Sequence, residues 1–151
     1  MYVFRNLDPT WYNRIKVGLS QDPIERGKQL YTTGVPFPFE PYFAWAVTDM
    51  AYAEHIAHAV LADHRLHDSR EHFDVIPGRD RMVVLGTFGD PTEEEVLVCL
   101  GVLLELIDVE YDSCKLLDYY SVDVAQLNDY SLQRKRTAKN PSNPEAYGPL
   151  F

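Results

Sequence analysis

Glu54 and His58 lie four residues apart on a predicted helix, and this spacing places a carboxylate and an imidazole on one face, where they could act together. They stand in the phrase EHIAH, which differs from the zinc pattern HExxH because its glutamate is itself one of the spaced pair. Five histidines fall within residues 55–72, and such a cluster could bind a transition metal by chance. Arg26 could hold a phosphate with two hydrogen bonds, although a solvated helix arginine is the ordinary alternative.

The first 76 residues predict the elements that would position these side chains. Apolar or alternating runs predict strands at 2–4, 14–18 and 42–47. Capping residues and helical spacing predict helices from 23 to about 33 and over 50–66. Loop residues and a terminal segment follow. We therefore expect an α/β (α+β) fold, with a small antiparallel three-stranded sheet flanked by helices in the order β-β-α-β-α.

The second half is predicted to be a mostly helical extension. The turn residues at 77–80 indicate a boundary, and 82–88 could form a strand. The helix expected at 93–108 is apolar on nearly every side, so it should be buried or held against a partner. A further helix is expected at 122–137. The domains expected are a core at 1–78, an acidic helical extension at 79–140 and a flexible tail at 141–151.

Charge is distributed unevenly along the chain. The formal net charge is −9, which argues against a general nucleic-acid binder that depends on phosphate neutralisation. Residues 1–76 are nearly balanced, residues 90–129 hold eleven acids against one lysine, and residues 134–139 are basic. The two cysteines lie far apart and suggest neither a disulfide framework nor a zinc site. With no signal layout and no apolar run long enough to span a bilayer, we expect a cytoplasmic protein.

Phrases in the first half resemble the GIY-YIG nuclease superfamily in order and spacing. They are KVG at 16–18, ERGKQLYTTGVPFPFE at 25–40, EHIAH at 54–58 and EHF at 71–73. They are most similar to the KIG-type branch, named from a phage open reading frame and a meiotically up-regulated fission-yeast gene. The resemblance implies the β-β-α-β-α core and covers about half of the chain. In that family the proline-stiffened phrase returns the chain from the first helix to the third strand.

The resemblance also implies roles for particular residues. Tyr2 would activate water, assisted by Lys16, whose ammonium would have to lower the pKa of the phenol. Arg26 would hold the scissile phosphate. Glu54 would hold one Mg²⁺ or Mn²⁺, since these ions prefer carboxylate oxygen and need only one or two protein carboxylates. Two residues would support the site: His58, and Glu71, which competes with Glu54 as the metal ligand.

The function that follows is a metal-dependent endonuclease acting on DNA or another nucleic acid. The alternative is a catalytically inactive scaffold that forms a homodimer or binds a protein partner through the 93–108 helix, with Leu103 and Ile107 in the contact. A third reading is an acidic mimic that occupies a nucleic-acid site on another protein. A purely structural role stays open for each of these residues. Tyr2 could be an aromatic residue that packs in the core, and Lys16 or Glu54 could be a solvated surface residue.

Overall fold

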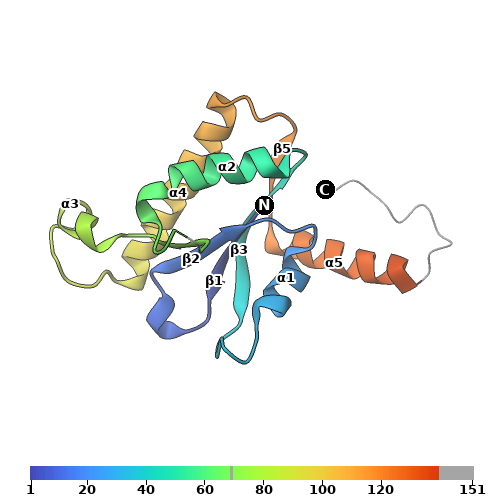
Figure 1. The fold of residues 1–151 in the computed structure, drawn as a ribbon, viewed down its shortest axis with the longest axis horizontal. Coiled ribbons are helices and arrows are strands. Elements are labelled where there is room, and N and C mark those ends of the chain that lie inside the picture. The colour runs from blue at the N-terminus through green and yellow to red at the C-terminus, as the bar shows by residue number, and fades with distance from the viewer. Residues whose placement is uncertain (69, 140–151) are drawn as a thin grey trace.

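The computed structural model describes residues 1–68 and 70–139, and it has an α+β fold built on one five-stranded antiparallel sheet (Figure 1). The strands lie in the order β4-β2-β1-β3-β5, so the first strand of the chain is central. Their bounds are β1 Tyr2–Asn6, β2 Arg14–Gly18, β3 Phe39–Val47, β4 His72–Asp74 and β5 Tyr119–Val122. The predicted fold class is confirmed, with five strands in place of three.

Pairing between the first two strands fixes which side chains share a face of the sheet. Tyr2 pairs with Gly18 and Phe4 pairs with Lys16. On the other side of β2, Lys16 pairs with His72 of β4. Because directly opposed residues of antiparallel strands project to the same face, all five lie on one face of the sheet.

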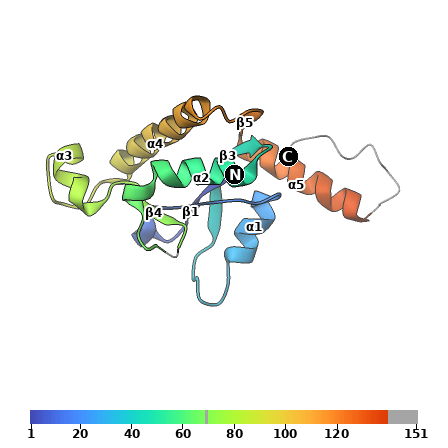
Figure 2. The same cartoon turned by 45° about the horizontal axis from the view of Figure 1, so that its top comes forward.

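Helices cover both faces of this sheet (Figure 2). Their bounds are α1 Pro23–Leu30, α2 Met50–Val60, α3 Arg81–Leu85, α4 Glu93–Ser113 and α5 Val124–Lys139. The helices α2 and α4 lie together on one face, where they enclose the main core around Trp45 and Leu100. The helices α1 and α5 lie on the other face, where Ile24 and Leu127 pack against β3 and β5.

Local sequence signals explain where the helices of the core begin. The Asp22 side chain caps α1 by accepting a hydrogen bond from the backbone of Glu25 at 3.1 Å, and Pro23 occupies the first turn. The Asp49 side chain caps α2 in the same way, through the backbone N–H of Tyr52. Asp22 and Asp49 are therefore the N-cap residues of these two helices.

The proline-rich connection between α1 and β3 is held by the end of β1. The Asn6 amide donates to the carbonyl of Phe37 at 2.9 Å, and the backbone N–H of Leu7 donates to the carbonyl of Pro38 at 3.0 Å. Gly27 of α1 lies so close to β3 that a Cβ there would be 3.0 Å from the carbonyl oxygen of Phe39. The connection therefore holds α1 tightly against the sheet.

The segment 82–88 was predicted as a strand, and this prediction is wrong. Residues Arg81–Leu85 form the short helix α3, which ends at Gly86 in the left-handed conformation with φ of 69°. The valines there favour a strand, but a strand needs a neighbour to bond, and Val83 is largely exposed. The helix predicted at 50–66 is also shorter, since α2 ends at Val60. The tail expected at 141–151 lies outside the described residues.

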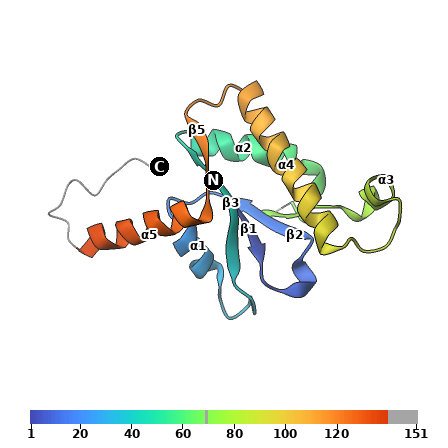
Figure 3. The ribbon, with the colours of Figure 1, turned by 180° about the vertical axis from the view of Figure 1, so that it is seen from behind.

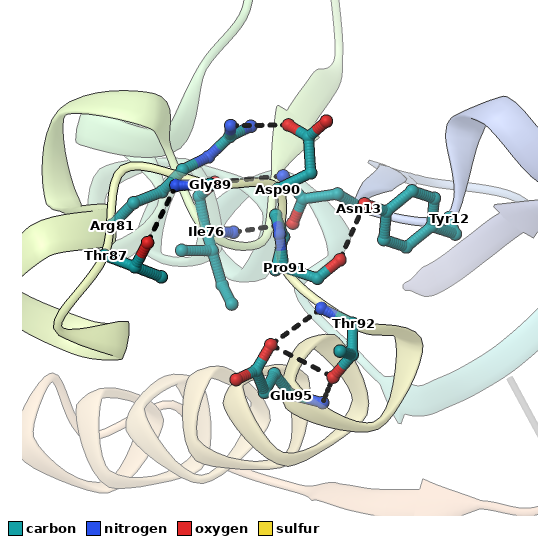
Figure 4. A network of polar contacts seen from close by, with 10 residues as sticks. All are labelled: Tyr12, Asn13, Ile76, Arg81, Thr87, Gly89, Asp90, Pro91, Thr92 and Glu95. Carbon is teal, nitrogen blue, oxygen red and sulfur yellow. Dashed lines mark hydrogen bonds and ion pairs between the residues drawn. The ribbon is translucent and has the colours of Figure 1, made fainter.

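A network of polar contacts joins the loop between β1 and β2 to the start of α4 (Figure 4). The Tyr12 hydroxyl donates to the carbonyl of Pro91 at 2.6 Å. Thr92 and Glu95 form a reciprocal capping box that starts α4. Asn13 exchanges two hydrogen bonds with the backbone of Ile76, each of 2.9 Å. These contacts, together with β5, attach the second half of the chain to the core.

Within the described ranges, none of the helices combines the length and the apolar character needed to cross a membrane.

Candidate active site

Tyr2 belongs to a group of four polar or charged side chains that come from separate elements. The ring of Tyr2 is 1% exposed and stacks on Phe4, with 4.0 Å between the ring centroids. The charges of Arg26 on α1, Glu54 on α2 and Glu71 just before β4 all act on the Tyr2 hydroxyl. The structure therefore brings together residues that are up to 69 positions apart in the sequence, at the end of the sheet where β1 begins.

The electrostatics of Tyr2 differ from the sequence-based expectation. Burial raises the pKa of Tyr2 above its ordinary value; the hydrogen bonding and charge of Arg26 lower it, and the carboxylates of Glu71 and Glu54 raise it further. The net shift is upward, so the phenol keeps its proton at neutral pH. The prediction that Lys16 would lower the pKa of Tyr2 is wrong, because the cation beside the hydroxyl is Arg26.

Lys16 instead forms an ion pair with Glu71. Its Nζ lies 2.7 Å from Oε2 of Glu71, and the side chains are 8% and 42% exposed. Burial alone would raise the pKa of Glu71, but the hydrogen bond and charge of Lys16, with smaller contributions from His58 and Arg26, hold it below its usual range. The backbone carbonyl of Glu71 also accepts from Val17, which continues the ladder between β2 and β4. Glu71 is thus fixed in place as a carboxylate.

Glu54 is the carboxylate of this group that forms no ion pair within the described part of the chain, although its charge acts on the buried N-terminal amine of Met1. It is half-buried on α2, and it makes no hydrogen bond or salt bridge with the described residues. A single available carboxylate fits a hard divalent ion such as Mg²⁺, which fills its other positions with water and phosphate. Among the residues that the structure describes, no group of three or more His, Cys, Asp or Glu side chains could hold a metal. Binding of Mg²⁺ or Mn²⁺ at Glu54 therefore stays a prediction.

His58 lies one turn after Glu54 on α2, as the spacing predicted. Its Nε2 is 3.3 Å from the backbone carbonyl oxygen of Val17, and its ring lies 5.3 Å from that of Phe73 between centroids. These contacts place the imidazole at the end of β2, next to Gly18. His58 therefore lies beside the cluster and ties α2 to the strand that carries Lys16.

Sequence reasoning gave no role to Gly18, although it belongs to the quoted phrase KVG. A Cβ at this position would lie 2.7 Å from the Tyr2 hydroxyl oxygen and 3.2 Å from Oε2 of Glu71. Such distances are far inside van der Waals contact, so only glycine leaves room for both groups. A glycine inside a predicted strand is the signal that could have indicated a close approach.

His72 is a second residue that the sequence interpretation passed over. Its ring is enclosed by Trp11 and Phe39, at 6.1 and 6.0 Å between ring centroids, and its buried Nε2 has no hydrogen-bond partner among the described residues. Burial, together with the positive charges of Lys16 and Arg14, lowers the pKa of His72 from 6.5 to about 4. The imidazole is therefore neutral in the folded protein at neutral pH.

The lowered pKa of His72 predicts a loss of stability in acid. The unfolded chain binds the proton near pH 6.5 and the folded protein only near 4, so stability falls as the pH drops through this window. Between pH 7 and 4.5 the free energy of unfolding should fall by about 1–2 kcal/mol less in His72→Phe than in wild type. This value is reduced to allow for the partial exposure of His72. Urea unfolding at both pH values measures this. The exposed residue His55 supplies the matched control, His55→Phe, and an equal loss in wild type and His72→Phe would contradict the assignment.

Two cavities in the described part of the chain are lined by residues other than Tyr2, Arg26, Glu54 and Glu71. One of about 520 Å³ is lined by the loop between β1 and β2, by Tyr42 of β3 and by Glu93 at the start of α4. The other, of about 440 Å³, lies between α1 and α5, beside Lys28 and Asn128. The cluster around Tyr2 is thus defined by its side chains and their charges, and neither cavity belongs to it.

Comparison with known proteins identifies the first half of the chain. A family model described as the T5orf172 domain matches residues 1–84, more than half of the chain. This phage-derived domain is related to GIY-YIG and HNH-like nucleases and is associated with nuclease-like and DNA-binding roles. No curated protein and no solved structure matches the chain. The match covers all of the candidate site and leaves α4, β5 and α5 outside it, and the narrower KIG-type branch stays a prediction.

Proposed function

This chain belongs to the T5orf172 domain family, and from that premise we propose that it is a metal-dependent endonuclease that hydrolyses DNA phosphodiester bonds. The observation that supports this most is that the charges of Arg26, Glu54 and Glu71, from three separate elements, all act on the hydroxyl of Tyr2. Phosphoryl transfer depends mainly on positioning and on stabilising charge, and this cluster offers a cation, two carboxylates and a hydroxyl donor for that purpose.

Arg26 is the residue we assign to the scissile phosphate. Its guanidinium is half-buried on α1, beside the Tyr2 hydroxyl, so part of its charge is shielded from water. A guanidinium can donate two parallel hydrogen bonds to phosphate oxygens. In a partly dry site, such bonds stabilise the charge that develops on the phosphate more strongly than they would in water.

Tyr2 is assigned a positioning role in place of the general-base role expected from the sequence. Because burial raises its pKa, the phenol is a hydrogen-bond donor at neutral pH. Its ring is fixed by Phe4, and its hydroxyl by the close approach of Gly18. The hydroxyl is therefore suited to orient the attacking water or a phosphate oxygen at a fixed point beside Arg26.

Glu54 is the residue that would hold a divalent cation, since Glu71 is already paired with Lys16. When bound, Mg²⁺ or Mn²⁺ would neutralise charge on the phosphate and on the leaving oxygen. The acidic helix α4 does not oppose DNA at Arg26, because α4 packs on the sheet face opposite to α1 (Figure 2). This arrangement keeps the acids of α4 away from Arg26, whereas Glu54 lies on α2, the helix that packs against α4.

The proposal is tested by nicking of supercoiled plasmid at low salt. We expect wild-type protein to nick with Mg²⁺ or Mn²⁺ and to lose this activity in EDTA. Glu54→Gln removes one ligand charge and should raise the metal concentration for half-maximal nicking by roughly tenfold or more. The matched control is Glu105→Gln on an exposed part of α4. Nicking that persists in EDTA, or an unchanged metal requirement in Glu54→Gln, would contradict the assignment.

A second candidate function is supported by an apolar stripe on α4. Val98, Val102, Leu106 and Val109 are exposed at helical spacing, with Val98 65% exposed. The residues expected in a partner contact, Leu103 and Ile107, are instead buried in the core. Exposed acids such as Glu94 and Glu105 flank the stripe, which disfavours a second copy and favours a basic protein partner. This binding role would become the leading one if no metal supports nicking.

A further inference from the structure

The helix α5 packs against the start of α1, immediately before Arg26. The Ser131 hydroxyl is buried and donates to Oδ2 of Asp22 at 2.9 Å. The Arg134 guanidinium donates to the backbone carbonyl of Gln21 at 3.2 Å. Figure 3 shows α5 running from the sheet past α1 and projecting beyond it. The orientation of α5 is therefore fixed by contacts with the helix that carries Arg26.

These contacts change the charge beside Arg26. Glu25, its neighbour on α1, forms ion pairs with both Lys135 and Lys28, and their hydrogen bonds lower the pKa of Glu25. Because Lys135 comes from α5, that helix compensates a carboxylate that would otherwise repel a phosphate held by Arg26. The packing of α5 thus has an electrostatic consequence for the proposed site.

The helix pair is cationic although the chain is acidic. Residues 22–30 and 124–139 hold six Lys or Arg side chains against three carboxylates, a net charge of +3 in a chain of −9. All four cations of α5 are exposed: Arg134, Lys135, Arg136 and Lys139. Exposed cations on a helix that is packed against the arginine-bearing α1 can neutralise backbone phosphates, and Arg136 and Lys139 form no ion pair with the described residues.

We propose that α5 and α1 together form a contact surface for the DNA backbone, extending from Arg26 to Lys139. The chemistry recognised is the phosphate backbone of duplex DNA, since the side chains that carry the argument are cations, which pair with phosphate oxygens. This inference rests on the proposed function, and it assigns a role to the basic residues at 134–139 that lie outside the family match. The C-terminal helix would supply affinity, whereas the core would supply the chemistry.

The test measures binding separately from cleavage. A fluorescein-labelled DNA duplex is titrated in EDTA and followed by fluorescence anisotropy at several salt concentrations. The variant Arg136→Gln/Lys139→Gln removes two exposed cations and leaves the contacts of Ser131 and Arg134 intact. Each lost phosphate contact should reduce the slope of log K against log salt by about 0.9, so we expect a decrease of about two and an affinity roughly tenfold lower.

The control is Arg79→Gln/Lys115→Gln, which removes two exposed cations outside α1 and α5. Its DNA affinity and its slope of log K against log salt should both stay near the wild-type values. Circular dichroism melting checks that both double variants fold. If Arg136→Gln/Lys139→Gln binds with the affinity and salt slope of this control, the proposal is overturned. Failure of the catalytic function looks different: wild type would bind through α5, yet no divalent metal would support nicking.

Discussion

Arg26→Ala is expected to lower the rate constant for metal-dependent plasmid nicking by roughly 10³-fold. Arg26 is the cation whose hydrogen bond and charge act on the Tyr2 hydroxyl, and Lys16 cannot replace it because its ammonium is paired with Glu71 at 2.7 Å. Loss of the guanidinium would remove the phosphate ligand. It would also raise the pKa of Tyr2 further, since Arg26 is the group that opposes the effect of burial. Single-turnover nicking at saturating Mg²⁺ measures the rate constant.

Two variants show whether the effect belongs to the guanidinium. Arg26→Lys keeps the charge but loses the planar pair of donors, so it should recover only part of the rate. Arg79→Ala removes an exposed arginine that pairs with Asp63 and belongs to no part of the proposed site, so this variant should nick as wild type does. A nicking rate for Arg26→Ala within a few fold of Arg79→Ala would exclude Arg26 from the reaction, provided that thermal melting shows both variants folded.

The parts of this fold that local patterns specify were predictable from the sequence. Asp22 and Asp49 cap helices where the sequence placed helix starts. Glu54 and His58 share one face of α2, because a spacing of four residues defines a helix face whatever surrounds it. The capping box of Thr92 and Glu95 likewise starts α4 at residue 93, where the sequence predicted the start of a helix. Each of these features depends on residues only a few positions apart.

The features that were missed depend on pairs far apart in the chain. The strand β5 has only four residues, and its partner β3 lies more than 70 positions earlier, so nothing local distinguishes it from a loop. The ion pair of Lys16 with Glu71 spans 55 positions and redirects the lysine that was expected to act on Tyr2. The family resemblance named these residues, but it could not say which cation faces which oxygen. That depends on register and burial.

Gly18→Ala is expected to lower the nicking rate by roughly 10²-fold and the free energy of unfolding by about 1–3 kcal/mol. The added methyl would lie 2.7 Å from the Tyr2 hydroxyl oxygen and 3.0 Å from its Cζ. Glu71 could move only by giving up its ion pair with Lys16, and the buried Tyr2 ring, stacked on Phe4, could move only by disturbing the core. Gly34→Ala, where a Cβ would meet nothing within 4 Å, is the matched control.

The double variant Tyr2→Phe/Gly18→Ala separates packing from chemistry. Removing the hydroxyl removes the atom closest to the new methyl, so part of the lost unfolding free energy should return, as measured by urea titration. If the Tyr2 hydroxyl orients a reacting group, the nicking rate should stay low in the double variant and in Tyr2→Phe alone. If the rate recovers together with the stability, the hydroxyl takes no part in the reaction, and Gly18 serves only to admit a packed aromatic ring.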